Sequence, residues 1–342
     1  MRTTRIAAGA ALAFLGMALP AFAETPTLTI SVYGIAQDAY KKDLYDPFEA
    51  TCGCTLVVET GNSSERLAKL EANKAAPVID VAAIADFNAL EAVRKDLVQP
   101  IDVSKLANYN TLYDIAQDPL GGHVAVGYTF YSTSIVYRSD KVSITSWKDL
   151  FKPELAGRIA LPNITTTQGP SAIYMIDKAE GGTTPDLKAG IDAIAANREG
   201  VVTFYERGSQ IPQLFEQEEI LAAVVGRFGW ANIRKLDLPI KWATPSEGQT
   251  GGMNVLTLVK GTKNEALALK FIDYWLSKEV QTRLATDLVD SPANKNVEVP
   301  AETAESLTYG AETAASLHFI KPADMLENRD AWVAGWNAKV TQ

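Results

Sequence analysis

Residues 28–33, Leu28-Thr-Ile-Ser-Val-Tyr33, begin a run in which β-rich segments alternate with segments of helical pattern. Alternating or mainly apolar composition predicts strands at 28–33, 56–59 and 78–84. Apolar residues at helical spacing predict helices at 38–49, 63–72 and 87–93. Strands that alternate with helices are typical of a parallel, doubly wound sheet covered on both faces. Ligands of such sheets bind at the carboxyl ends of the strands.

The second half of the chain repeats this α/β pattern with different lengths. Strands are predicted at 124–137, 158–161, 201–205, 221–225 and 254–259. Helices are predicted at 168–176, 184–196 and 211–217, and residues 264–284 predict one long helix or a broken pair. About 320 residues beyond the N-terminal segment exceed one ordinary core. We therefore predict two doubly wound α/β lobes.

The N-terminal segment has the three parts of a secretory signal peptide. Arg2 and Arg5 precede an apolar run from Ala7 to Leu19, and Ala21-Phe-Ala23 is a small-x-small cleavage site. The run is shorter than the roughly 20 residues of a membrane span. The alternative is a membrane anchor. We expect cleavage after Ala23 and a periplasmic protein that starts at Glu24.

Composition restricts the classes of partner. The chain has 32 Lys and Arg residues against 41 Asp and Glu residues, a formal net charge of −9. Nucleic-acid binding needs clustered basic residues, so we expect no nucleic-acid partner. The only cysteines, Cys52 and Cys54, are too few for a structural zinc site. A local disulfide, two free thiols and a redox pair all stay open.

Four stretches resemble a known family. These are 28–33 with the following helix that ends in Pro-Phe-Glu, the motif Trp147-Lys-Asp-Leu-Phe-Lys-Pro-Glu-Leu-Ala-Gly-Arg-Ile159, the segments Pro245-Ser-Glu-Gly and Asn254 to Ala266, and Phe271-Ile-Asp-Tyr-Trp-Leu-Ser-Lys-Glu-Val-Gln281. Together they resemble the extracellular solute-binding proteins of ABC importers, in the polyamine (spermidine/putrescine) branch. The resemblance covers about residues 27 to 300.

This resemblance implies a type II periplasmic binding protein, in which two crossing strands join two α/β lobes that close over a ligand. It places the first lobe at 24–127 and 253–300 and the second at 128–252, with 301–342 as a C-terminal helical segment packed on them. It also implies a small organic solute and an inner-membrane ABC permease as partners, and we expect a monomer. Gly127 and the Gly-rich stretch 248–252 are candidate hinge residues. The alternative is that these glycines only make turns.

Residues that an enzyme would need are scarce. The two histidines, His123 and His318, stand far apart without an obvious Cys, Asp or His neighbour. The sequence contains no nucleophile elbow, zinc-protease motif or phosphate-binding loop. We therefore expect no catalytic site, no metal ligand and no cofactor, and we keep a secreted hydrolase as the alternative from a different class.

Candidate ligand-binding residues follow predicted strands. Desolvated cations need a paired charge or an aromatic face, which is how polyamine binders of this family hold ammonium groups. By this resemblance Asp86 and Phe87 are first-lobe ligand contacts, Phe130 stands at a crossover where a Trp is usual, and Asn254 stands where polyamine binders have Asp. Two weaker candidates are Tyr33, which ends the first strand, and Ser64, at the start of a predicted helix whose N–H groups could bind an anionic oxygen.

Arg227 departs most from the polyamine pattern. A guanidinium at a strand end binds a carboxylate with paired hydrogen bonds and repels a polyamine. With Asp86 for an ammonium group, it predicts a zwitterion such as γ-aminobutyrate, and a polyamine is the alternative ligand. Two other interpretations stay open: Arg227 pairs with an acid such as Glu247, and Asp86 only caps the helix 87–93.

Overall fold

The computed structural model describes residues 25–183 and 185–341, so the predicted signal peptide lies outside the described residues. The strands in this part are β1 (Thr27–Val32), β2 (Thr55–Thr60), β3 (Val81–Ala85), β4 (Val98–Gln99), β5 (Val126–Arg138), β6 (Ile159–Pro162), β7 (Val201–Tyr205), β8 (Ala222–Gly226), β9 (Ile240–Trp242), β10 (Gln249–Val259) and β11 (Leu317–Phe319). They form one sheet with the order β2-β1-β3-β10-β5-β8-β6-β7, to which β4 and β11 add at β10 and β9 adds at β5.

Helices surround this sheet in both lobes. The α-helices are α1 (Gln37–Tyr40), α2 (Asp46–Cys52), α3 (Ser63–Ala72), α4 (Asp86–Arg94), α5 (Asp114–Gln117), α6 (Gly169–Ala179), α7 (Lys188–Ala196), α8 (Ile211–Glu216), α9 (Arg227–Ile233), α10 (Glu265–Trp275), α11 (Lys278–Thr286), α12 (Ala301–Ala304), α13 (Ala311–Ala315) and α14 (Pro322–Lys339). A π-helical turn, η1 (Lys41–Tyr45), joins α1 to α2, and the 3-10 turns are η2 (Val103–Lys105), η3 (Tyr109–Thr111), η4 (Trp147–Phe151), η5 (Pro153–Leu155), η6 (Arg198–Gly200) and η7 (Gly208–Gln210). Of the two alternatives predicted for 264–284, the structure has the broken pair, as α10 and α11.

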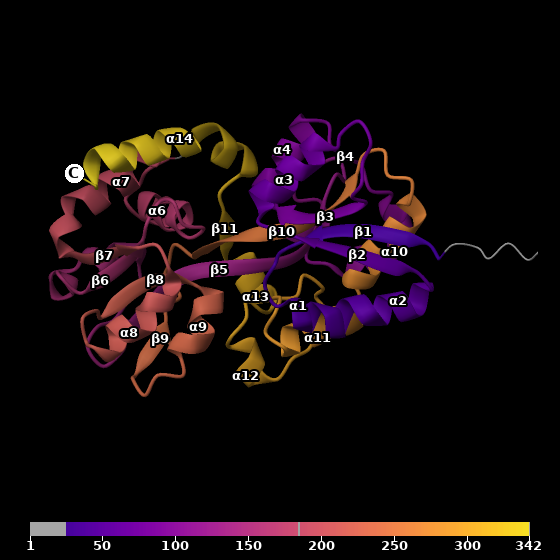
Figure 1. The fold of residues 1–342 in the computed structure, drawn as a ribbon. Coiled ribbons are helices and arrows are strands. Elements are labelled where there is room, and N and C mark those ends of the chain that lie inside the picture. Colours follow the sequence, from indigo (N-terminus) through magenta and orange to yellow (C-terminus); the bar gives the residue numbers. More distant parts are fainter. Residues whose placement is uncertain (1–24, 184, 342) are drawn as a thin grey trace, which may run out of the picture.

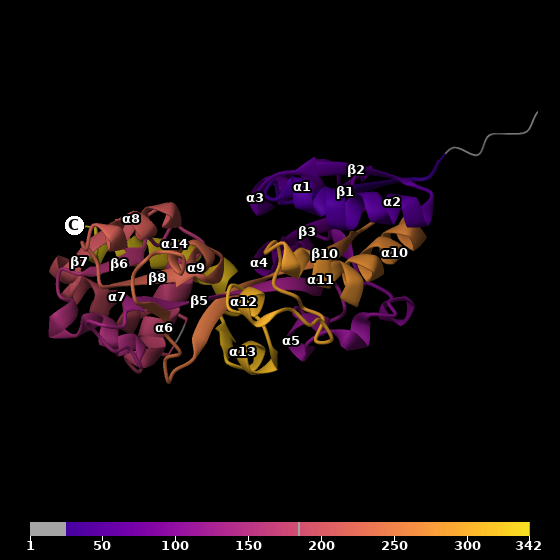
Figure 2. The same cartoon turned by 90° about the horizontal axis from the view of Figure 1, so that it is seen from below.

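Two lobes share the sheet, as predicted (Figure 1). In the first lobe β1 pairs in parallel with β2 and β3, and in the second lobe β6 pairs in parallel with β7 and β8. The long strands β5 and β10 run antiparallel to each other between the lobes and join both. Figure 2 shows the same two bodies from below, connected through β5 and β10.

Each lobe has its own apolar core. One cluster of buried side chains runs from Leu28 to Phe130 and resumes at Met253, so that both crossing strands contribute to it. The second lobe holds two clusters that lie between Ile135 and Ala243 in the sequence, and one of them also includes Trp332 and Trp336 of α14. The predicted lobe boundaries at 127 and 252 stay a prediction, because β5 and β10 pass from one core to the other without a break.

The Gly-rich stretch differs from the sequence prediction. Gly251 and Gly252 lie inside strand β10, which begins at Gln249 and not at Asn254. Neither glycine has a positive φ, whereas Gly248 just before the strand has φ +90°. A Cβ at Gly251 would strike the carbonyl oxygen of Tyr131, and one at Gly252 would strike the Tyr131 ring. These two glycines are needed for the close approach of β5 and β10.

The C-terminal segment is only partly helical. The prediction of a helical segment at 301–342 does not include a strand, but β11 lies within it and pairs in parallel with β10. The last helix, α14, packs against α7 of the second lobe and α4 of the first lobe. Within the described residues no helix combines the length and the apolar character that a bilayer span requires. A disulfide links Cys52 to Cys54 at the turn between α2 and β2.

Candidate functional site

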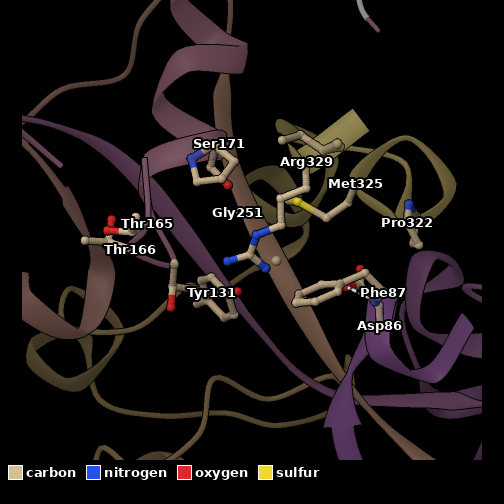
Figure 3. Close-up of a pocket in the computed structure, with 14 residues that line it drawn as sticks. Asp86, Phe87, Tyr131, Thr165, Thr166, Ser171, Gly251, Pro322, Met325 and Arg329 are labelled. Carbon is tan, nitrogen blue, oxygen red and sulfur yellow. Dashed lines mark hydrogen bonds between the residues drawn. The ribbon is translucent and has the colours of Figure 1, made fainter. Parts of the chain in front are cut away.

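A pocket lies where the two lobes, the crossing strands and α14 meet (Figure 3). Its cavity volume is about 150 Å³, which is smaller than the roughly 300–1,000 Å³ typical of drug-sized ligands. The lining residues come from four places in the fold: Asp86 and Phe87 from the first lobe, Thr165, Thr166, Thr167, Pro170 and Ser171 from the second lobe, Tyr131, Gly251 and Gly252 from the crossing strands, and Ile320, Pro322, Met325 and Arg329 from the C-terminal segment.

Asp86 supplies the carboxyl group of the pocket. The wholly buried strand β3 ends at Ala85, and α4 begins at Asp86. The Asp86 Oδ1 atom accepts from the neighbouring N–H of Phe87 at 2.7 Å, and the side chain caps no N–H deeper in α4. The residue is half-buried, and desolvation of its carboxyl group raises its pKa to about 7. Both Asp86 and Phe87 line the pocket, and their contact with a ligand stays a prediction.

Arg329 supplies the guanidinium of the pocket, and sequence reasoning missed it. Figure 3 shows its side chain directed from α14 into the pocket, toward the rings of Tyr131 and Phe87. With the other described residues it forms no ion pair within 4.0 Å. Arg329 is exposed, as an arginine in a long C-terminal helix is expected to be, and no local pattern in the sequence indicates a site there.

Tyr131, not Phe130, is the aromatic residue of β5 at the pocket. Phe130 is 1% exposed and packs its ring against Tyr113 in the first core, with ring centroids 5.8 Å apart. Successive side chains of a strand point to opposite faces, so the burial of Phe130 turns Tyr131 toward the cleft. The structure thus places Phe130, the predicted contact, in the first-lobe core, and it places Tyr131 in the pocket lining.

Tyr33, Ser63 and Asn254 form a hydrogen-bonded group at the strand ends of the first lobe. The Tyr33 hydroxyl lies 2.7 Å from Ser63 Oγ and donates to Asn254 Oδ1 at 2.9 Å. Asn62 caps α3 through a reciprocal bond with Glu65, which sets Ser63 as the first helical residue. The structure thus joins the predicted residues Tyr33 and Asn254, but it uses Ser63, and Ser64 is exposed and outside the group.

Arg227 lies outside the pocket lining. Its Nη2 donates to the carbonyl oxygen of Glu305 at 2.6 Å, and its guanidinium lies 4.5 Å from the ring of Trp242. Burial, with Arg234 nearby, lowers its pKa to about 10. The alternative partner Glu247 instead accepts from Ser146 and from the N–H of Trp147. Arg227 therefore does not pair with Glu247, and its role toward a ligand stays a prediction.

The histidines and acids do not gather into a metal site. Within residues 25–183 and 185–341, no three His, Cys, Asp or Glu side chains are placed to hold one ion. His123 Nδ1 lies 3.2 Å from the Tyr109 hydroxyl. His318 lies elsewhere, beside Gly248. The absence of metals and cofactors stays a prediction.

Comparisons with known proteins identify the family. The sequence profile of the bacterial extracellular solute-binding proteins matches residues 43–309. An ABC transporter structure from Clostridium perfringens is 32% identical, with a TM-score of 0.85 over 92% of this chain and 99% of that chain.

Two curated relatives add detail. The spermidine/putrescine-binding periplasmic protein of Escherichia coli is 25% identical over 71% of each protein. The γ-aminobutyric acid-binding protein of Pseudomonas aeruginosa is 25% identical over 94% of each. The profile match spans more than half of the residues, and the fold has the two lobes and crossing strands expected of it. The chain belongs to the family of bacterial extracellular solute-binding proteins.

Proposed function

We propose that the chain is the periplasmic substrate-binding component of an ABC importer and that it captures a small amino-carboxylate between its lobes. The observation that carries this proposal is that one carboxyl group and one guanidinium line the same pocket. Asp86 reaches it from the first lobe and Arg329 from α14. A zwitterion satisfies both charges, because its ammonium group pairs with Asp86 and its carboxylate with Arg329.

The pocket also suits a short apolar chain between the two charges. The rings of Phe87 and Tyr131 line the same cavity, and methylene groups next to an ammonium pack well on aromatic faces. γ-Aminobutyrate has this arrangement of ammonium, methylene chain and carboxylate. The relative from Pseudomonas aeruginosa that is named for γ-aminobutyric acid supports this ligand class.

A polyamine is the second candidate. Relatives named for spermidine, putrescine and cadaverine support it, as do Asp86 and the two rings of the pocket. Arg329 in the pocket and Asn254 in place of an acid favour the amino-carboxylate, because a diamine needs a second anionic partner.

The proposal also covers export of the protein and delivery of its solute. Residues 1–23 are a signal peptide that is removed on export, and the folded monomer passes its solute to an inner-membrane permease without chemical change. It is not an enzyme, a statement that rests on the family alone. Sequencing the N-terminus of the exported protein tests the cleavage: a chain that keeps Ala7 to Leu19 contradicts it.

The test is calorimetric titration of γ-aminobutyrate and putrescine into wild type, Asp86→Asn and Arg329→Ala. We expect Arg329→Ala to weaken γ-aminobutyrate by about tenfold or more, because a hydrogen bond between charged groups contributes roughly 1.5–3 kcal/mol. Arg329→Lys should restore only part of the affinity, since the planar guanidinium is lost. Putrescine binding should be unchanged or tighter in Arg329→Ala.

Lys235→Ala is the matched control, because it removes one exposed positive charge beyond the end of α9. It should change neither affinity. Native mass spectrometry of the protein as purified identifies any retained solute. Tighter binding of putrescine than of γ-aminobutyrate by wild type, or a retained diamine, would replace the amino-carboxylate with the polyamine.

A further inference from the structure

A buried guanidinium lies in α3 of the first lobe. Arg66 is only 2% exposed, and its guanidinium carbon lies 3.8 Å from the centre of the Tyr33 ring. Among the described residues no carboxylate lies within 4.0 Å of it, and its Nε and Nη1 atoms are enclosed without a hydrogen-bond partner. Burying an unpaired cation is costly, and arginine keeps its charge in proteins. The one hydrogen bond that the guanidinium forms among the described residues, from Nη2 to Ser63 Oγ, therefore connects this buried charge to the rest of the lobe.

That contact starts a directed series of hydrogen bonds. Ser63 Oγ accepts from Arg66 Nη2 and from the N–H of Ala85, each at 3.1 Å. A hydroxyl oxygen has two lone pairs, so both are occupied and its proton is free to donate. The donor is next to the Tyr33 hydroxyl at 2.7 Å, which makes Tyr33 the acceptor of this bond.

The series ends at Asn254. Because the Tyr33 oxygen accepts from Ser63, its own proton goes to Asn254 Oδ1 at 2.9 Å. This assigns the amide orientation from the hydrogen-bond network, as is required for asparagine. The Asn254 amino group then points away from Tyr33. It donates to no residue in the described part of the chain, and it is not among the enclosed unpaired atoms.

Asn254 adjoins the pocket. It stands two residues after Gly252 in β10, on the same face of the strand, and Gly252 lines the pocket. Its neighbour across the sheet is Ala85, which immediately precedes Asp86. The free amino group of Asn254 thus lies on the side of the sheet where the solute would bind.

We propose that Arg66 is a positioning residue that determines ligand specificity: through Ser63 and Tyr33 it holds the Asn254 amide with its N–H groups toward the cleft. This inference rests on the proposed function and deepens it. The Asn254 N–H groups then bind an oxygen at the carboxylate end of the ligand, the end that Arg329 also binds in the proposed function. An ammonium group at the same place meets two N–H donors and a buried cation, so a second amine is rejected.

Two ligands of equal chain length measure this selectivity. γ-Aminobutyrate and putrescine share a four-carbon chain and differ in one end group. In Arg66→Met the series loses its charged donor and the amide is free to turn. We expect γ-aminobutyrate to bind about five- to tenfold more weakly, within the effect of one hydrogen bond from a charged group, and putrescine to bind equally or more tightly. Arg66→Lys should fall between wild type and Arg66→Met.

The adjacent serines give a matched pair of variants. Ser63→Ala interrupts the series and should shift the ratio of the two affinities in the direction of Arg66→Met. Ser64→Ala changes an exposed hydroxyl one residue later and should leave the ratio unchanged. Asn254→Asp leaves the buried groups in place and replaces the donor with an acceptor, so putrescine should gain.

A double-mutant cycle separates positioning from a general structural role. If Arg66 acts through Asn254, then Arg66→Met should change the affinity ratio less than twofold in an Asn254→Ala background. A shift that persists there, or an equal loss for both ligands in Arg66→Met, would overturn the proposal.

A measurement without ligand keeps the two proposals apart. The side-chain NH₂ signal of Asn254 is identified in ¹⁵N-labelled protein by its absence from Asn254→Ala. It should broaden or double in Arg66→Met and in Ser63→Ala, and stay unchanged in Ser64→Ala. If neither solute binds wild type, the proposed ligand class is wrong, and this signal alone decides the role of Arg66. An unchanged signal in Arg66→Met would refute it.

Discussion

Single residues carry the pH behaviour of the proposed site. Desolvation holds the pKa of Asp86 at about 7, so its carboxyl group is half protonated at neutral pH. An ammonium ligand needs the ionised carboxylate. The affinity for γ-aminobutyrate should therefore rise about tenfold between pH 6 and pH 8, because binding releases a proton.

Calorimetry at these two pH values, in buffers of different ionisation enthalpy, measures both the affinity and the proton release. Asp86→Asn should bind weakly at either pH and release no proton. A wild-type affinity that does not change with pH would show that Asp86 does not meet the ligand's ammonium group.

Asp290 gives a second pH effect, on stability and not on binding. It is buried, accepts from the Tyr40 hydroxyl at 2.8 Å, and has its pKa raised by burial to about 7. The unfolded carboxyl titrates near pH 3.9. Between about pH 4 and pH 7 the folded state therefore holds a proton that the unfolded state has lost, and the free energy of unfolding falls as the pH rises.

We expect a higher melting temperature at pH 5 than at pH 8, measured by differential scanning fluorimetry without ligand. Asp290→Asn keeps an acceptor for Tyr40 and cannot titrate, so the difference between the two pH values should become smaller. The same difference in wild type and variant would assign the effect to other groups.

At the scale of elements, the strand β5 has a strict space requirement. Gly127 has no positive φ, but a Cβ there would lie 2.6 Å from Met253 Sδ and 2.9 Å from Ala116 Cβ. Gly127→Ala should therefore lower the free energy of unfolding by about 1–3 kcal/mol, the usual cost of overpacking. The reason is contact between β5, β10 and α5, and a role of Gly127 in hinge motion stays a prediction.

Gly229→Ala is the matched control, since a Cβ at Gly229 in α9 meets nothing within 4 Å. It should be neutral or stabilising by up to about 1 kcal/mol, because alanine has the higher helix propensity. Urea unfolding of the three proteins checks both expectations. Equal stability of Gly127→Ala and wild type would mean that Met253 and α5 relax without cost.

For the whole molecule, closure of the lobes is the main expectation. Two large apolar side chains are strongly exposed just after strands of opposite lobes, Ile35 (74%) after β1 and Phe228 (66%) after β8. Surface of this kind is available for burial when the lobes approach. Saturation with the ligand should therefore reduce the radius of gyration in solution scattering and raise the melting temperature by mass action.

Scattering curves with and without γ-aminobutyrate measure closure, with Asp86→Asn as the control that should not respond. Phe228→Ser should leave the unliganded curve unchanged and weaken closure on the ligand. Binding of a ligand with unchanged scattering would contradict a hinge mechanism.

Much of the architecture is predictable from local pattern. The strands from 28–33 to 221–225 and the neighbouring helices follow from the side-chain spacing of adjacent residues, which is a local property. The prediction for Asp86 rests on the family resemblance, which places a first-lobe ligand contact directly after the buried strand.

The composition of the pocket depends instead on contacts between distant residues. Phe130 and Tyr131 are equivalent in pattern, and the packing of Phe130 on Tyr113 selects which of them faces the cleft. Arg329 enters the pocket because Trp332 and Trp336 anchor α14 in the second core. Spacing along the chain determines which residues form a helix or a strand. Which of their side chains meet is settled by the packing of segments that are not neighbours in the chain.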